Sequence, residues 1–337
     1  MQSSIIAEFA LAPLAVALGD PAGIGPEIVG KAWAARAESG LLPFFAVGDA
    51  GSIGIHWPGP VARIANPEDA ISVFGNALPV LHIVDCGTVA AGKPTTEGAR
   101  CALAALELAT GLTRSGAAAA LVTAPVSKAA LYAIGFTFPG QTEFVAERCG
   151  VSRDNAVMML AGPTLRVVPV TTHIAFGDVV SRLTIELIVA KARATARGLV
   201  RDFGLVAPRI AVAGLNPHAG EDGTIGREEI EIISPAVALL REEGIDAVGP
   251  LASDTLFHPR ARATYDAAIC MYHDQALIPL KALHFDEGVN VTLGLPIVRT
   301  APDHGTAFGI AGRNIANSGA MIAAIRVAGE AAAARAV

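Results

Sequence analysis

Three histidines occupy equivalent points of the chain, each shortly after an apolar run that predicts a buried strand. His173 ends RVVPVTTH, His218 ends RIAVAGLNPH and His273 follows AAICMY. In open parallel sheets ligands gather beyond the carboxyl ends of the strands, so we expect these imidazoles to converge. Neutral imidazoles suit a divalent cation that keeps one position open for a substrate. Each histidine taken singly also fits a polar loop, but the coincidence of three favours a metal site.

Carboxylates near these histidines are candidates for orienting an imidazole or for transferring a proton. Asp274, for example, directly follows His273. A plain loop carboxylate is the alternative for each of them. His56 and His82 are expected to be structural, whereas one further histidine, in PDHGTAFG, is a functional candidate. The residues considered for catalysis or for support of the metal ligands are Asp254, Asp274, Asp303 and His304.

A second group of residues suits an anion. The stretch from 277 to 300 holds Lys281, Asn290 and Arg299 in a surrounding almost free of other cations. A lysine offers a point charge and an arginine a bidentate fork, which together suit a phosphomonoester. In PGQTEF, Thr142 is predicted to cap a helix, which is either plain capping or one more donor to the anion. Ordinary surface charge is the alternative.

The segment GDPAGIGPE, residues 19–27, follows the first predicted strand and opens a helix. Its spacing, GxxxGxG, is neither the dinucleotide fingerprint nor a P-loop. Two interpretations stay open: a tight turn from strand to helix, or an amide-rich turn that contacts a ligand.

Apolar runs alternate with helical patterns along the whole chain, which predicts an α/β protein built on parallel strands. Helices are expected near 96–112, with Thr96 as N-cap, at 184–203, at 227–244 and after Ser318. A Gly-rich region spans 288–305. Strands are predicted at 14–20, 42–49, 77–85, 118–128, 155–162, 166–173, 209–218 and 267–275.

Composition narrows the class of protein. The 337 residues suit two α/β units with a large aliphatic core, since hydrophobic residues make up 52% and aromatic ones 5%. A net charge of -6 without a Lys/Arg cluster argues against nucleic acid or an anionic membrane as partner. We expect a cytoplasmic protein without a membrane anchor. The cysteines, predicted to be buried thiols outside any zinc or redox motif, are Cys86, Cys101, Cys149 and Cys270.

The chain contains, in this order, the motifs GDPAGIGPE, TAPVSK, TEF, TTH, GLNPHAGE, SDTLF, MYHDQ, GVNVTLGLPIVRT and DHGTA. Together they closely resemble the 4-hydroxythreonine-4-phosphate dehydrogenase family of pyridoxal phosphate biosynthesis. The resemblance covers about residues 14 to 325.

This resemblance implies a fold like that of isocitrate and isopropylmalate dehydrogenases, with two α/β/α domains, the site in the cleft between them and a homodimer interface at the site. We expect one domain from 1–135 together with 280–337 and the other from 136–279. NAD or NADP is implied, bound without a Rossmann fingerprint, and no cofactor-binding residue is assigned. The implied metal ligands are His173, His218 and His273, and the implied substrate-binding residues are Gln141, Thr142, Lys281, Asn290 and Arg299.

The implied reaction is the metal-dependent oxidation of a phosphorylated hydroxy amino acid, 4-phosphooxy-L-threonine, to a β-keto acid that loses CO2. Imidazole ligands favour Zn2+ or Co2+ over Mn2+ or Mg2+. The chain departs from the family at Gln141, where histidine is common. Glutamine neither carries a charge nor titrates near neutrality, so only a substrate-positioning role is expected there.

Three alternatives remain. Related dehydrogenases oxidise other phosphorylated hydroxy acids, such as threonate or erythronate phosphate. Others oxidise aromatic cis-dihydrodiols, although such unphosphorylated substrates have little use for both Lys281 and Arg299. From another class, a metal-dependent hydrolase or lyase would use three histidines without a nicotinamide.

Overall fold

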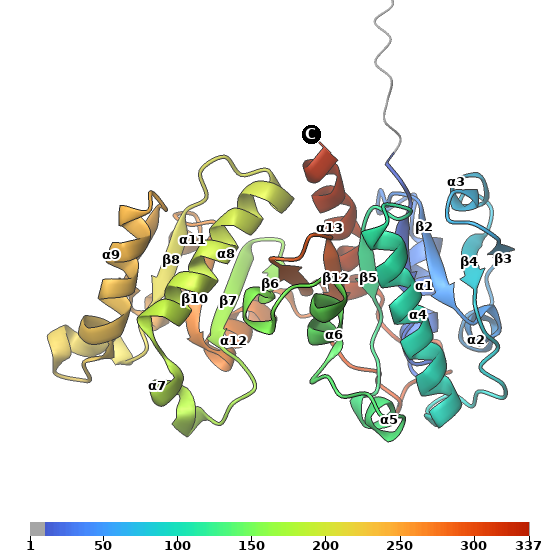
Figure 1. The fold of residues 1–337 in the computed structure, drawn as a ribbon, viewed down its shortest axis with the longest axis horizontal. Coiled ribbons are helices and arrows are strands. Elements are labelled where there is room, and N and C mark those ends of the chain that lie inside the picture. Colours follow the sequence, from blue (N-terminus) through green and yellow to red (C-terminus); the bar gives the residue numbers. More distant parts are fainter. Residues whose placement is uncertain (1–10, 337) are drawn as a thin grey trace, which may run out of the picture.

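The computed structural model describes residues 11–336, in which helices cover both faces of one continuous sheet of twelve strands (Figure 1). The α/β class predicted from the sequence is confirmed. The strands, in their order across the sheet, are β3 (Val61–Ile64), β4 (Leu78–His82), β2 (Phe44–Gly48), β1 (Leu14–Ala17), β5 (Leu121–Thr123), β12 (Arg299–Pro302), β11 (Val289–Leu293), β6 (Val157–Gly162), β7 (Leu165–Thr171), β10 (Ala267–Tyr272), β8 (Ile210–Ala213) and β9 (Ala247–Leu251).

The sheet consists of two parallel blocks joined by antiparallel strands. The first block runs from β3 to β12, and the second from β7 to β9. Between them β11 is antiparallel to both β12 and β6, and β6 is antiparallel to β7. The two blocks therefore run in opposite directions. The expectation of a parallel sheet holds within each block and is wrong at the junction.

Eight predicted strands are present, because runs such as LAVA in β1 and IAVA in β8 are buried along their whole length. Four strands escaped prediction. The edge strands β3 and β9 are only partly buried, which weakens the apolar pattern. The strands β11 and β12 lie in the Gly-rich region at 288–305, where no strand was predicted.

Two apolar layers of helices enclose the sheet. On one face α1, α8, α9 and α13 bury a core continuous across both blocks. On the other face α4, α5 and α6 cover the first block, and α10 and α12 cover the second. The helices are α1 (Gly25–Ala34), α2 (Ala50–His56), α3 (Asp69–Val73), α4 (Thr96–Arg114), α5 (Lys128–Ala133), α6 (Gln141–Arg148), α7 (Val179–Arg182), α8 (Ile185–Phe203), α9 (Ser234–Glu242), α10 (Ser253–Leu256), α11 (Pro259–Arg262), α12 (His273–His284) and α13 (Gly319–Ala336).

Local capping explains where the helices begin and end. The hydroxyl of Thr184 accepts a bond from an amide of α8, which ends at Gly204 in the left-handed conformation. The predicted N-cap of α4 was displaced by one residue, since Thr95 caps it. The predicted cap at Thr142 was also wrong, because Gly140 occupies that position. The helix expected at 227–244 is divided into a π-helical turn, η4 (Glu229–Ile233), and α9.

The predicted domain boundaries, at 135/136 and 279/280, stay a prediction. The chain does return from the second block to the first, since α13 follows β12 and packs on it (Figure 1). Within residues 11–336 no helix is both long and apolar enough to cross a membrane. Residues 1–10, which form part of the N-terminal segment expected to lack an anchor, lie outside the described residues.

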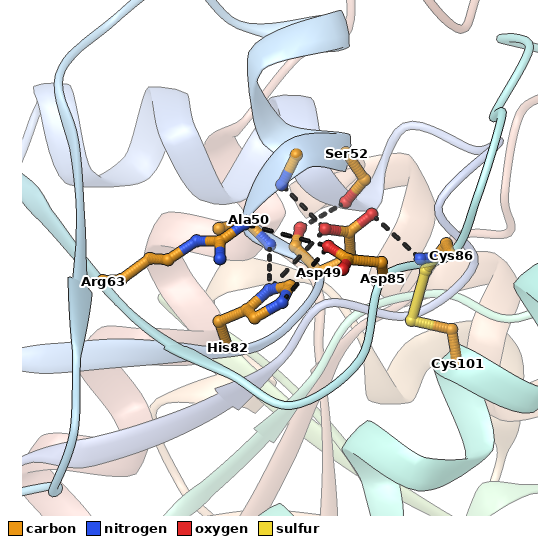
Figure 2. A network of polar contacts seen from close by, with 9 residues as sticks. Asp49, Ala50, Ser52, Arg63, His82, Asp85, Cys86 and Cys101 are labelled. Carbon is orange, nitrogen blue, oxygen red and sulfur yellow. Dashed lines mark hydrogen bonds and ion pairs between the residues drawn. A yellow bond between two sulfur atoms is a disulfide. The ribbon is translucent and has the colours of Figure 1, made fainter.

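Cys86 and Cys101 form a disulfide, so the expectation of buried thiols was wrong for these two residues and the pairing was missed. Cys149 and Cys270 are free thiols, of which Cys270 is buried as predicted and Cys149 is only partly buried. The bond joins the segment after β4 to the first turns of α4, over a Cα–Cα distance of 5.9 Å. The backbone N–H of Cys86 also donates to the Asp49 carboxylate (Figure 2). Distant parts of the first block are therefore fastened together.

We predict that Cys86→Ser lowers the free energy of unfolding by about 3 kcal/mol, since opening the bond releases a loop of 15 residues in the unfolded chain. Urea unfolding without reductant measures the change, with Cys149→Ser as the matched control that leaves stability within about 0.5 kcal/mol. Thiol titration of the denatured, unreduced protein should find two thiols. Four thiols would contradict the pairing.

Candidate active site

A cavity of about 910 Å³ brings most of the predicted site residues together. Its walls come from both blocks of the sheet, from the segments after β5 and β7, and from α6, α8 and α12. Asp254, on α10, lies outside it, as does His218. Asp274 lies outside it too but lines a smaller adjoining cavity. The predicted residues that line the large cavity are Gln141, Thr142, His173, His273, Lys281, Asn290, Arg299, Asp303 and His304.

His173 and His273 form a pair. Their ring centroids lie 5.7 Å apart, and both line the large and the small cavity. His173 has a φ of 53°, in the left-handed region that non-glycine residues rarely occupy. Burial lowers the pKa of His173, with Lys128 and His273 acting in the same direction. His273 begins α12, and its Nδ1 lies 2.7 Å from Asp274 Oδ1.

His218 lies apart from this pair. It is exposed in η3 (Pro217–Gly223), where the residues from 218 to 222 all have positive φ. Two sets of hydrogen bonds hold this turn in place. Glu229 Oε1 accepts hydrogen bonds from the backbone N–H groups of residues 215 and 216 at 2.7 Å, and the side-chain amide of Asn216 donates to the carboxylates of Glu228 and Glu229. Within one chain, the structure thus brings together two of the three predicted ligands.

Arg299 is the deepest cation of the cavity, with 3% of its surface exposed. Its guanidinium donates to three threonine hydroxyls, those of Thr123 at 2.7 Å and of Thr142 and Thr292 at 3.0 Å. Its Nε has no partner. Burial lowers the pKa of Arg299 to about 10, opposed by the charge of Glu143. No carboxylate within the described residues forms an ion pair with it.

The other predicted substrate residues are less deeply placed. Lys281 pairs with Asp303 at 3.0 Å, so its charge already has a partner. The side-chain oxygen of Asn290 is buried and has no hydrogen-bond partner among the described residues. Gln141 Nε2 donates to the carbonyl of Ala124 at 3.3 Å, which holds its side chain against the segment after β5.

The cavity carries an excess of positive charge, although the whole chain is negative. Five cationic and three anionic side chains line it. Sequence reasoning missed most of them, since they stand on ordinary helical or loop patterns. Two motifs offered a signal: TAPVSK, which ends at Lys128, and TEF, which contains Glu143. Burial lowers the pKa of Lys191, opposed by Asp154. The lining charges are Lys128, Arg153, Lys191, Lys281, Arg299, Glu143, Asp154 and Asp303.

Asp49, His82 and Asp85 form the trio within residues 11–336 whose ligand atoms lie within 4.8 Å of one another (Figure 2). Protein contacts already engage these atoms. Asp49 accepts backbone N–H bonds on both oxygens. His82 Nδ1 accepts from Ala50 N–H at 3.2 Å, and its Nε2 lies 3.3 Å from Asp85. The trio therefore has a structural role, as expected for His82.

The turn at 19–27 is tightly packed. A Cβ on Gly19 would lie 2.3 Å from the carbonyl of Pro125, and one on Gly25 would lie 2.3 Å from that of Leu18. The amide of Ile24 donates to the Thr306 carbonyl. These contacts account for the glycines without a ligand, which favours the interpretation as a tight turn.

The donor set of the histidine pair fits a divalent cation. Two adjacent imidazoles supply nitrogen ligands, and the Asp274 contact at Nδ1 of His273 leaves Nε2 available. The small cavity beside the pair, of about 250 Å³, leaves room for further ligands.

Comparison with known proteins gives a consistent family. The family model "Pyridoxal phosphate biosynthetic protein PdxA" matches residues 49–328. The chain is 60% identical to 4-hydroxythreonine-4-phosphate dehydrogenase of Zymomonas mobilis, over 94% of each chain. The crystal structure of the Klebsiella pneumoniae enzyme of that name superimposes with a TM-score of 0.85, at 38% identity over 95% of this chain and 98% of that one. Terephthalate 1,2-cis-dihydrodiol dehydrogenase of Burkholderia xenovorans gives 0.64, at 29% identity over 94% and 97%.

We predict that His173→Ala and His273→Ala each weaken Co2+ binding by about 100-fold or more, since even residues that only orient a ligand contribute tenfold to 100-fold. Calorimetric titration of the full chain with Co2+ measures the affinity. His82→Ala, which alters the second cluster, is the control and should bind as the unaltered protein does. Loss of binding in that variant alone would move the metal site to the Asp49 cluster.

Proposed function

The chain belongs to the pyridoxal phosphate biosynthetic protein PdxA family, and from that premise we propose that it oxidises 4-phosphooxy-L-threonine with NAD or NADP and a divalent metal. The product is 2-amino-3-oxo-4-phosphooxybutanoate, a β-keto acid that loses CO2 to give 3-amino-2-oxopropyl phosphate. As a member of this family of dehydrogenases, the protein is an oxidoreductase of pyridoxal phosphate biosynthesis.

The observation that carries the proposal is the charge of the cavity. Five cations face three carboxylates in a chain whose net charge is -6. Arg299 in particular is buried and has only neutral hydroxyls as partners. A buried cation is costly unless an anion compensates it, so the cavity fits a substrate that brings phosphate and carboxylate groups.

The side chains that line the cavity have different roles in substrate binding. Arg299 and Lys281 bind the anionic groups of the substrate, and Asn290, which also lines the cavity, contacts the substrate through its side-chain amide. Gln141 and Thr142 position the substrate from the first turn of α6. His173 and His273 would hold a divalent cation, preferably Zn2+ or Co2+ rather than Mn2+ or Mg2+, which would supply Lewis acidity to the reacting alcohol, and NAD or NADP would supply the oxidant.

Asp303 is the aspartate that we assign to proton transfer. It lines the cavity beside Lys281, whereas Asp254 lies outside and Asp274 orients His273. His304 also lines the cavity, but it is exposed and bonds a neighbouring carbonyl. Gln141, which stands where histidine is common in the family, cannot replace Asp303 as an acid or base because it does not titrate near neutrality.

We further propose that the protein is a homodimer, in which His218 of one subunit completes the metal site of the other. Within its own chain, His218 lies outside both cavities that the histidine pair lines. Beside that pair the surface is apolar and open: Phe176 is 74% exposed, and Ile174 and Val180 are exposed as well. Such a patch next to an incomplete site suits a second copy of the chain.

The strongest rival is oxidation of an aromatic cis-dihydrodiol, because the terephthalate dihydrodiol dehydrogenase has a similar fold. That substrate carries no phosphate. A metal-dependent hydrolase or lyase is the rival from another class, and dehydrogenases of threonate or erythronate phosphate are the rivals that keep the phosphate. Of these rivals, only the cis-dihydrodiol is favoured by a structural comparison. A terephthalate dihydrodiol also carries carboxylates that Arg299 could bind, so a comparison of substrates must distinguish the two functions.

We predict that the metal-loaded protein, given 4-phosphooxy-L-threonine and NAD or NADP, produces reduced nicotinamide and CO2 in equal amounts. Absorbance at the NADH wavelength follows the oxidation, and a panel of threonate phosphate, erythronate phosphate and a cis-dihydrodiol serves as the comparison. A higher kcat/KM for any panel member identifies that rival. Consumption of substrate without reduction of the nicotinamide would establish the hydrolase or lyase.

We predict that His173→Ala and His218→Ala are each inactive, but that their co-expressed mixture recovers about a quarter of the activity. Half of the dimers in a random mixture are mixed, and each mixed dimer contains one intact site if His218 comes from the partner subunit. As the control, a mixture of His173→Ala with His273→Ala should recover nothing, since those two ligands lie in one chain. If the first mixture is also inactive, all three ligands come from a single chain.

A further inference from the structure

The guanidinium of Arg299 is held by residues from three separate elements. Thr123 is the last residue of β5, Thr292 lies in β11, and Thr142 lies in the first turn of α6. Thr123 and Thr292 are each 1% exposed, so their hydroxyls have no access to bulk water. Thr123 begins the motif TAPVSK and Thr292 lies within GVNVTLGLPIVRT, but neither residue was predicted from the sequence to have a role.

The hydrogen-bond partners of Arg299 are neutral hydroxyls, which affects the net charge of this part of the cavity. A carboxylate in this position would hold the guanidinium more strongly, but it would also neutralise it. Hydroxyls accept the hydrogen bonds and leave the positive charge uncompensated. Residues 11–336 contain no carboxylate within ion-pair distance of Arg299, so the charge remains available to a ligand.

Two of the five N–H donors of Arg299 make no hydrogen bond within the described residues. Arginine has two N–H groups on each terminal nitrogen and one on Nε. Nη1 donates to both Thr142 and Thr292, and Nη2 donates to Thr123. The second N–H of Nη2 and the one on Nε are left. Nε is enclosed by protein atoms, so the remaining N–H of Nη2 is the donor left for a ligand in the cavity.

We propose that Thr123 and Thr292 are positioning residues, which fix the guanidinium of Arg299 so that the remaining N–H of its Nη2 and its positive charge receive an anionic group of the substrate. The inference rests on the proposed function for the identity of that substrate, but the anion site itself is open to a separate test. The two threonines act through Arg299 and need not touch the substrate. Their role explains why hydroxyls are buried at the end of β5 and within β11.

The test uses isosteric substitutions in the full chain. Thr123→Val and Thr292→Val remove a hydroxyl at nearly constant volume, whereas Thr123→Ser and Thr292→Ser retain it. Thr300→Val is the matched control, because Thr300 is a buried threonine of β12 whose hydroxyl bonds the Ala324 carbonyl instead. Where a valine variant does not fold, the alanine variant at the same position replaces it.

The first readout is calorimetric binding of inorganic phosphate without substrate. We expect each valine variant to bind phosphate roughly tenfold or more weakly, since a hydrogen bond to a charged group is lost. The serine variants and Thr300→Val should bind phosphate as the unaltered protein does. Unchanged binding in the valine variants, or equal loss in the serine variants, would overturn the proposal, because packing alone would then explain the threonines.

The second readout is steady-state kinetics. The valine variants should raise the KM for the phosphorylated substrate by about tenfold and leave kcat and the KM for the nicotinamide within about threefold. A fall in kcat alone would also contradict a positioning role through anion binding. If the unaltered protein oxidises none of the substrates tested, the proposed function fails, and the phosphate titration still decides the role of the threonines.

Discussion

The antiparallel strand β11 joins the two parallel blocks, and the site depends on that junction. One edge of β11 pairs with β12 and the other with β6. Asn290 and Thr292 on β11 therefore lie beside Arg299 on β12, although the first block contributes Thr123 and the second contributes the histidine pair. Ligand sites in α/β sheets form where the strand arrangement reverses, and here the reversal brings anion-binding and metal-binding residues into one cavity.

The fold was predictable where burial alone determines the sequence. Strands such as β1, β8 and β10 are buried on both sides and read as continuous apolar runs. The strands β3 and β9 were missed because one neighbour and partial exposure leave little pattern in their residues. The strands β11 and β12 were missed because polar residues that line the cavity, such as Asn290 and Arg299, interrupt their apolar pattern. The disulfide between Cys86 and Cys101 depends on how α4 packs, which spacing alone does not reveal.

The site residues that could be predicted are those whose type is unusual for the surrounding sequence. Histidines after apolar strands and cations in an apolar stretch are unusual enough to be noticed. Thr123, although it begins the TAPVSK motif, is a residue type that is common in strands, and Lys191 is one that is common in helices. The assembly of His218 with the other histidines was not predictable from one chain. Both His173 and His218 have positive φ, a conformation that costs energy and persists only where surrounding contacts impose it. Glu228 and Glu229 provide those contacts for the turn of His218.

Gln141 bears on how the cavity retains its charge. A histidine at this position would add a positive charge that changes near neutral pH, whereas glutamine adds none. The excess of positive charge in this cavity then comes from lysine and arginine side chains, and Arg299 contributes a charge that no neighbouring carboxylate cancels. Substrate binding would accordingly depend on lysine and arginine side chains and on the threonines that orient Arg299. Proton transfer would depend on a different residue, Asp303. Separating the two tasks is consistent with a phosphorylated substrate, because its anion must stay bound while a proton leaves the alcohol.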